Sequence, residues 1–154
     1  MSQAVQNEAS PIAVFGRVRT DCVRFDCPEL DPSSAEVASV WSVIKSRFDE
    51  IRRLTFDWDH RGSATVPSGT LAFAQQMLTS VMPPKAAAPA IVPLGQGGIQ
   101  MVWRSTLGEL EVEVVKPNQV MIFYLDNATG AEHEWEESTD FRRLSDVLWK
   151  LHRT

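Results

Sequence analysis

The chain has 154 residues, 44% of them hydrophobic, and a formal net charge of −5, which together predict one soluble domain with a core of its own. The negative charge argues against sequence-independent binding to nucleic acid, because such binding needs clustered Lys and Arg. No run of about 18 apolar residues predicts a membrane span, and no export signal opens the chain, so we expect a cytoplasmic protein.

The N-terminal residues divide into a polar segment and a strand-like segment. Residues 1–10 are polar and are predicted to form a disordered tail, which leaves residues 11–154 as a single domain. Residues 11–25 contain one short alternating stretch, which predicts a strand. Cys22 and Cys27 have no second cysteine pair, a pattern more typical of two reduced thiols than of a four-ligand zinc site.

Two amphipathic helices are predicted in the first half of the chain. In residues 31–54, Ser33 is followed three residues later by Glu36, which predicts a capping box. The apolar residues of this segment recur at helical spacing and form one stripe: Val37, Val40, Trp41, Ile44, Phe48 and Ile51. A second helix is predicted from Ser68, taken as its N-cap, and ends before a pair of prolines, which cannot continue a helix. Its stripe consists of Leu71, Ala74, Met77, Leu78 and Val81.

From Ala90 the hydrophobic period changes from helical spacing to alternation. The alternating segments predict four or five strands, at residues 90–94, 98–105, 108–115, 119–126 and 131–137. The connections between them are short and rich in turn-forming residues, so consecutive strands should pair antiparallel as a meander. The last segment predicts a C-terminal helix with the stripe Phe141, Leu144, Leu148 and Leu151. The predicted fold class is therefore α+β, with two N-terminal helices, an antiparallel meander and a C-terminal helix packed on the sheet.

Two of the predicted strands carry six of the eight candidate partner-binding residues. In residues 108–115 the leucine and valines alternate with Glu109, Glu111 and Glu113, which should form the solvent-facing side of a one-sided sheet. Residues 119–126 are apolar on both sides, which predicts helices on both faces of this strand. In the alternative arrangement, one side of this strand is an exposed patch for a partner, made of Met121, Phe123 and Leu125.

The segment FDWDHRG, residues 56–62, begins like a calcium-binding loop. Asp57, Asp59 and Gly62 occupy positions one, three and six of such a loop, but Arg61 stands at position five and Ser68 replaces the glutamate at position twelve. The sequence therefore predicts no metal site and no cofactor here. A structured turn is predicted instead, in which the two aspartates accept backbone hydrogen bonds and the tryptophan between them packs on the core.

The same segment carries a resemblance. The Asp-Trp-Asp turn with its glycine, the helix after it, the proline-rich link, and Gly-Gly-Ile-Gln ending in tryptophan before a Glu-rich strand resemble a group of small bacterial proteins of unknown function. The resemblance covers about residues 54–136 and implies a compact α+β fold and a bacterial or phage origin, without implying an activity. Where that group has a tyrosine and small residues, this chain has His60 and Arg61. The residues that carry the resemblance are Asp57, Trp58, Asp59, Gly62, Gly97, Gly98, Ile99, Gln100 and Trp103.

No catalytic motif is recognisable in the sequence, so the first hypothesis is a non-enzymatic bacterial protein-interaction module, in an antitoxin, immunity or phage-defence setting. Its partner would be another protein of basic charge, with a homo-oligomer as a further option. The second hypothesis is a small metal-dependent hydrolase or nuclease that uses Asp57, Asp59 and His60. The predicted partner-binding residues are Glu109, Glu111, Glu113, Met121, Phe123, Leu125, His60 and Arg61.

Overall fold

The computed structural model describes residues 32–153. Residues 35–154 form one compact unit. The predicted tail at residues 1–10, the predicted strand within residues 11–25, and Cys22 and Cys27 lie outside the described residues. Within the described part of the chain, no helix is long and apolar enough to cross a membrane.

Three helices form where the apolar stripes predict them. They are α2 (Pro32–Arg52), α3 (Ser68–Val81) and α4 (Arg142–Leu151). The stripes are the buried sides of these helices: Ile44, Phe48 and Ile51 of α2, all five predicted residues of α3, and Leu144, Leu148 and Leu151 of α4 are at most 4% exposed. The prediction that Ser68 is an N-cap is wrong, because α3 already includes this residue and its N-cap, Pro67, makes no side-chain hydrogen bond. The predicted capping box depends on the side chain of Ser33, which lies outside the described side chains.

The four or five predicted strands form one antiparallel sheet of five. They are β1 (Ala90–Pro93), β2 (Ile99–Ser105), β3 (Gly108–Lys116), β4 (Gln119–Asp126) and β5 (Glu132–Glu137). Their spatial order is the order in the sequence, β1-β2-β3-β4-β5, so the sheet is a meander with β1 and β5 at its edges. The predicted α+β class with an antiparallel meander and a C-terminal helix is confirmed for residues 32–153.

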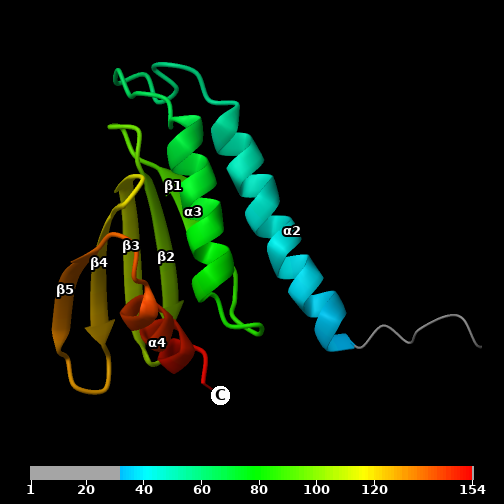
Figure 1. Cartoon of the computed structure of the whole chain (residues 1–154), viewed down its shortest axis with the longest axis vertical. Coiled ribbons are helices and arrows are strands. Elements are labelled where there is room, and N and C mark those ends of the chain that lie inside the picture. Colours follow the sequence, from blue (N-terminus) through cyan, green and yellow to red (C-terminus); the bar gives the residue numbers. More distant parts are fainter. Residues whose placement is uncertain (1–31, 154) are drawn as a thin grey trace, which may run out of the picture. The chain divides into compact units, whose positions relative to one another are not determined.

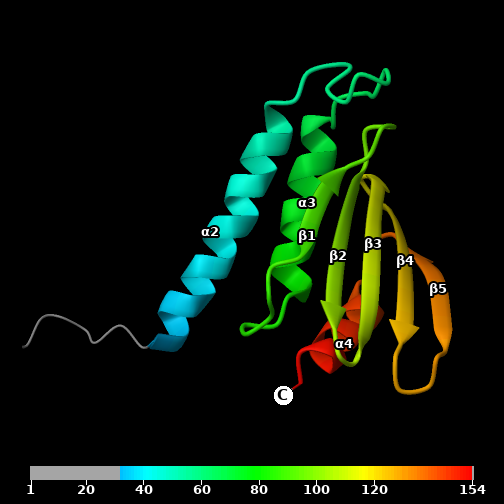
Figure 2. The ribbon, with the colours of Figure 1, turned by 180° about the vertical axis from the view of Figure 1, so that it is seen from behind.

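The helices lie on one face of the sheet. Figures 1 and 2, which view the chain from opposite sides, show α3 and α4 against the same face, with α2 beside α3. The expectation that helices cover both faces of β4 is therefore wrong. Among the described residues no element covers the second face, which we call the open face.

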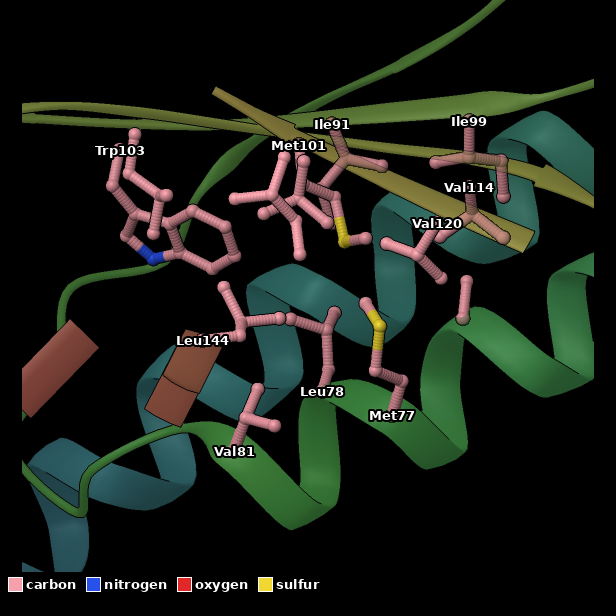
Figure 3. Close-up of a cluster of buried hydrophobic side chains, with 14 of the residues drawn as sticks. Met77, Leu78, Val81, Ile91, Ile99, Met101, Trp103, Val114, Val120 and Leu144 are labelled. Atoms are coloured by element: carbon pink, nitrogen blue, oxygen red, sulfur yellow. The ribbon is translucent and has the colours of Figure 1, made fainter. Parts of the chain in front are cut away.

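The hydrophobic core fills the space between the sheet and the helices. Figure 3 shows Met101 and Ile91 of the sheet pointing toward Met77 and Leu78 of α3. Trp103, at one end of this cluster, donates its indole N–H to the carbonyl oxygen of Ala87 at 3.2 Å. This bond attaches the proline-rich link to the sheet. The inward alternation of β2 and β3 predicted from the sequence is confirmed, since Ile99, Met101, Trp103, Leu110, Val112 and Val114 are all buried.

Candidate functional site: the open face of the sheet

The centre of the open face is an apolar stripe on β4. Met121, Phe123 and Leu125 point away from the helices; Met121 is 41% exposed, and the other two are half-buried. Residues two apart on a strand lie about 6.6–6.8 Å apart, so the stripe is roughly 13 Å long. Its exposure follows from the packing of α3 and α4 on the opposite face of the sheet, which leaves this side of β4 uncovered.

A row of glutamates lies on each side of this stripe. On β3, Glu113 is opposite Met121, Glu111 is opposite Phe123, and Glu109 is opposite Leu125. On β5, the same three apolar residues are opposite Glu136, Glu134 and Glu132. Neighbouring strands are about 4.8 Å apart, so the two rows are separated by roughly 10 Å. We call this surface, the apolar stripe with its two glutamate rows, the acidic face.

The glutamates of the acidic face raise the pKa of a neighbouring arginine. Arg104 of β2 forms an ion pair with Glu109, at 2.8 Å between Nη2 and Oε1. The hydrogen bond and charge of Glu109, together with the charge of Glu111, raise the pKa of Arg104 above its usual value. Gln100 donates to Glu111 at 3.1 Å between Nε2 and Oε2. The remaining glutamates have no cationic side chain within ion-pair distance among the described residues.

The structure brings together six of the eight partner-binding residues predicted from the sequence. All three glutamates of β3 and all three apolar residues of β4 lie side by side on the acidic face. The glutamates of β5 were not among the predicted site residues, although they alternate in EHEWEE. They join the site because β4 and β5 pair in the register that places this row against the stripe.

The inward side of β5 carries an aromatic cluster next to α4. The ring of His133 stacks on Tyr124, with 6.0 Å between the ring centroids. Trp135 is covered by the guanidinium of Arg143 at 4.1 Å from its ring centroid and donates its indole N–H to Glu137 Oε1 at 2.9 Å. Glu137 is buried, and this burial raises the pKa of its carboxyl, against the lowering effect of the bond from Trp135.

The DWDHRG loop is a turn closed by its own aspartates, as predicted. Asp57 Oδ1 accepts the backbone N–H of Gly62 at 2.7 Å. Asp59 accepts the backbone N–H of Arg61 at 3.0 Å and the hydroxyl of Ser63 at 2.7 Å. Gly62 has a φ of 80°, in the left-handed region that a side chain would strain. Both carboxylates therefore serve to shape the turn.

His60, Arg61 and Trp58 of the same loop fulfil only some of their predicted roles. His60 and Arg61 are exposed, and no hydrogen bond or ion pair within residues 32–153 joins either side chain to the acidic face. Trp58 donates its indole N–H to the carbonyl oxygen of Ala64 at 3.2 Å, so it does anchor the turn. The prediction that Trp58 packs on the core is wrong, because it is half-buried and lies outside the hydrophobic core cluster. The turn closes through its own backbone, so Trp58 bonds the nearby Ala64 carbonyl and does not reach the core.

We expect Asp59→Asn to lower the melting temperature at neutral pH. The Ser63 hydroxyl and the amides of Arg61 and Ser63 hold the pKa of Asp59 below its usual value. A lowered pKa in the folded state contributes stability above the unfolded pKa, and this contribution is lost as the pH falls through the folded pKa. The difference in melting temperature between the two proteins should therefore shrink on acidification. Thermal denaturation followed by circular dichroism over a pH series measures this, and equal melting temperatures at neutral pH would contradict it.

Within the described residues, no group of three or more His, Cys, Asp or Glu side chains is placed to hold a metal ion. No protein-family model, curated protein or solved structure matches this chain. The resemblance to small bacterial proteins therefore stays a prediction.

Proposed function

We propose that this protein is a non-enzymatic protein-interaction module that binds a basic partner through the acidic face. The observation that carries the proposal is the uncovered apolar stripe of β4 between two rows of glutamates. Its ideal complement is a surface with an apolar ridge between cationic side chains. Burial of the stripe would supply affinity, and the two charged rows would fix orientation.

The charge pattern favours a basic protein over other partners. Glutamates about 7 Å apart along each row repel one another, and the two rows, roughly 10 Å apart, are about one Debye length from each other at physiological salt. A cationic partner relieves this repulsion and is steered toward the face as it approaches. Nucleic acid and anionic lipid surfaces carry the same sign of charge as the face and are repelled by it.

The hydrolase hypothesis gains no support from the loop that it would use. The carboxylates of Asp57 and Asp59 accept hydrogen bonds within the turn, and His60 is exposed to solvent. An antitoxin or immunity protein, which neutralises a basic enzyme by covering it, is one class of protein that would use such an acidic face.

A photocrosslinking experiment tests the proposal. In one variant p-benzoylphenylalanine replaces Phe123, at the centre of the acidic face. In the matched control it replaces Phe56, which is 71% exposed and directly precedes the DWDHRG loop. Irradiation in the native host should crosslink a basic protein to position 123 and not to position 56. Equal crosslinking at both positions, or none at position 123, would count against the acidic face as the binding site.

Charge reversal provides the second measurement on the same face. We expect Glu111→Lys combined with Glu134→Lys to abolish the crosslink at position 123. The control is Glu36→Lys combined with Glu50→Lys, which changes the net charge equally on the exposed side of α2. If both pairs of substitutions reduce the crosslink to the same extent, the net charge of the chain, and not the acidic face, directs the binding.

A further inference from the structure

The outer edge of β5 offers unpaired backbone groups to a partner. β5 has six residues, contains no proline, and pairs only with β4. No backbone hydrogen bond joins its outer edge to another residue between 32 and 153. Every second N–H and C=O along this edge therefore points outward, in the arrangement that allows a further strand to add to a sheet.

The opposite edge of the sheet is protected in ways that β5 is not. β1 has only four residues and ends at Pro93, which has no N–H to donate. The carbonyl oxygen of Ile91 is already occupied, because it accepts a hydrogen bond from Arg47 Nε of α2 at 2.8 Å. Of the two edges, only β5 is long enough and free enough to pair with another chain.

The space beside β5 is shaped for alternating side chains. On one side of the sheet a further strand would place every second side chain next to Glu132, Glu134 and Glu136. On the other side its remaining side chains would enter a groove of about 240 Å³ between β5 and α4. Since a cavity of about 150 Å³ accommodates benzene, this groove has room for an aromatic side chain. Its lining residues are Tyr124, His133, Trp135 and Val147, together with the charged side chains of Arg143, Asp146 and Lys150.

We infer that a partner binds by adding an extended segment to β5 as a sixth strand, in which cationic residues alternate with apolar ones. The inference rests on the proposed function and specifies how the partner binds. The cationic residues face the β5 glutamates, an apolar or aromatic residue enters the groove, and backbone hydrogen bonds hold the segment at the edge. Pairing of β5 with β5 of a second copy is disfavoured, because it sets glutamate rows of like charge side by side.

The experiment uses the full chain and the synthetic peptide KVKFKVK. In such an alternating segment, only the odd or only the even residues direct their N–H groups toward β5. We would therefore compare the parent peptide with one N-methylated at its lysines and one N-methylated at its apolar residues. The peptide KVKAKVK tests the groove, and EVEFEVE tests the charge. Fluorescence anisotropy measures affinity, and amide hydrogen exchange at residues 132–137 reports pairing.

We expect the parent peptide to bind and to slow exchange of the outward amides of β5. One of the two N-methylated peptides should lose at least about tenfold in affinity while the other retains it, since one methylated set blocks the edge hydrogen bonds. KVKAKVK should bind roughly tenfold or more weakly, because a phenylalanine side chain loses its burial, and EVEFEVE should not bind.

The two proposals fail in different ways. If both N-methylated peptides bind as the parent does, while Glu111→Lys with Glu134→Lys abolishes binding, then the peptide docks on the acidic face and the edge inference is overturned. If the parent peptide binds equally well after charge reversal, both the edge inference and the acidic face as its charge partner are overturned. No binding of the parent peptide also overturns the edge inference. So does a dimer in analytical ultracentrifugation whose outward amides at residues 132–137 are protected from exchange.

Discussion

Trp103→Ala should destabilise the protein by about 3–5 kcal/mol, as expected for emptying the site of a buried aromatic side chain. Trp103 is 3% exposed and pairs across the sheet with Leu110. Figure 3 shows it reaching from β2 toward Leu144 of α4, so its removal leaves a cavity between sheet and helix. The lost bond to Ala87 would also release the proline-rich link from the sheet. Urea denaturation followed by tryptophan fluorescence and circular dichroism gives the free energy of unfolding.

Trp149→Ala is the matched control for this experiment. Trp149 lies on α4 and is 52% exposed, so the same change of residue type removes little buried surface. We expect its free energy of unfolding to stay within about 0.5 kcal/mol of the wild type, as is usual for surface substitutions. Equal destabilisation by the two substitutions would mean that Trp103 does not have the role in the core described above.

Gly108→Ala should give the second large effect, through a clash with the backbone. Gly108 begins β3, and a Cβ atom there would collide with the carbonyl oxygen of Leu125 on β4 and lie 3.0 Å from Cε2 of Tyr124. A carbonyl oxygen in a ladder cannot move aside as a flexible side chain can, so β3 and β4 would have to separate at this end. Overpacking of this kind costs about 1–3 kcal/mol and occasionally more. Thermal and urea denaturation measure the loss.

Gly69→Ala is a control of opposite sign. Gly69 lies in the first turn of α3, where an added Cβ would come no closer than 4.0 Å to Cγ of Pro117. Because alanine restricts the unfolded chain more than glycine does, we expect a gain of about 0.4–1 kcal/mol. If Gly108→Ala were as stable as Gly69→Ala, β3 would not approach the Leu125 carbonyl oxygen as closely as described.

The exposed apolar stripe also explains why this surface carries so many glutamates. A long edge strand and an exposed apolar stripe are both features that promote aggregation, and charged neighbours oppose it. In this chain the same glutamates that would attract a basic partner would keep copies of the protein apart. Replacing the β5 glutamates therefore changes both the attraction of a basic partner and the repulsion between copies. Binding experiments with such variants need a check of their oligomeric state.

The sequence by itself determined the elements and most of the inward and outward positions. In β3, Leu110, Val112 and Val114 alternate with glutamates, and this local period of two places the charged side chains outward whatever the rest of the fold does. The helical stripes of α3 and α4 are local in the same sense. The turn at Asp57 and Asp59 was also predictable, because aspartates bond backbone amides that lie only a few residues away.

Only the tertiary structure decided which side of β4 is covered and what surrounds it. Val120, Ile122 and Tyr124 on one side are as apolar as Met121, Phe123 and Leu125 on the other, so the alternation of this strand contains no information about direction. The choice follows from α3 and α4 packing together on one face, which buries the first set and leaves the second on the open face. The second glutamate row and the groove beside β5 depend on the register of β5 and the position of α4, which join residues distant in sequence.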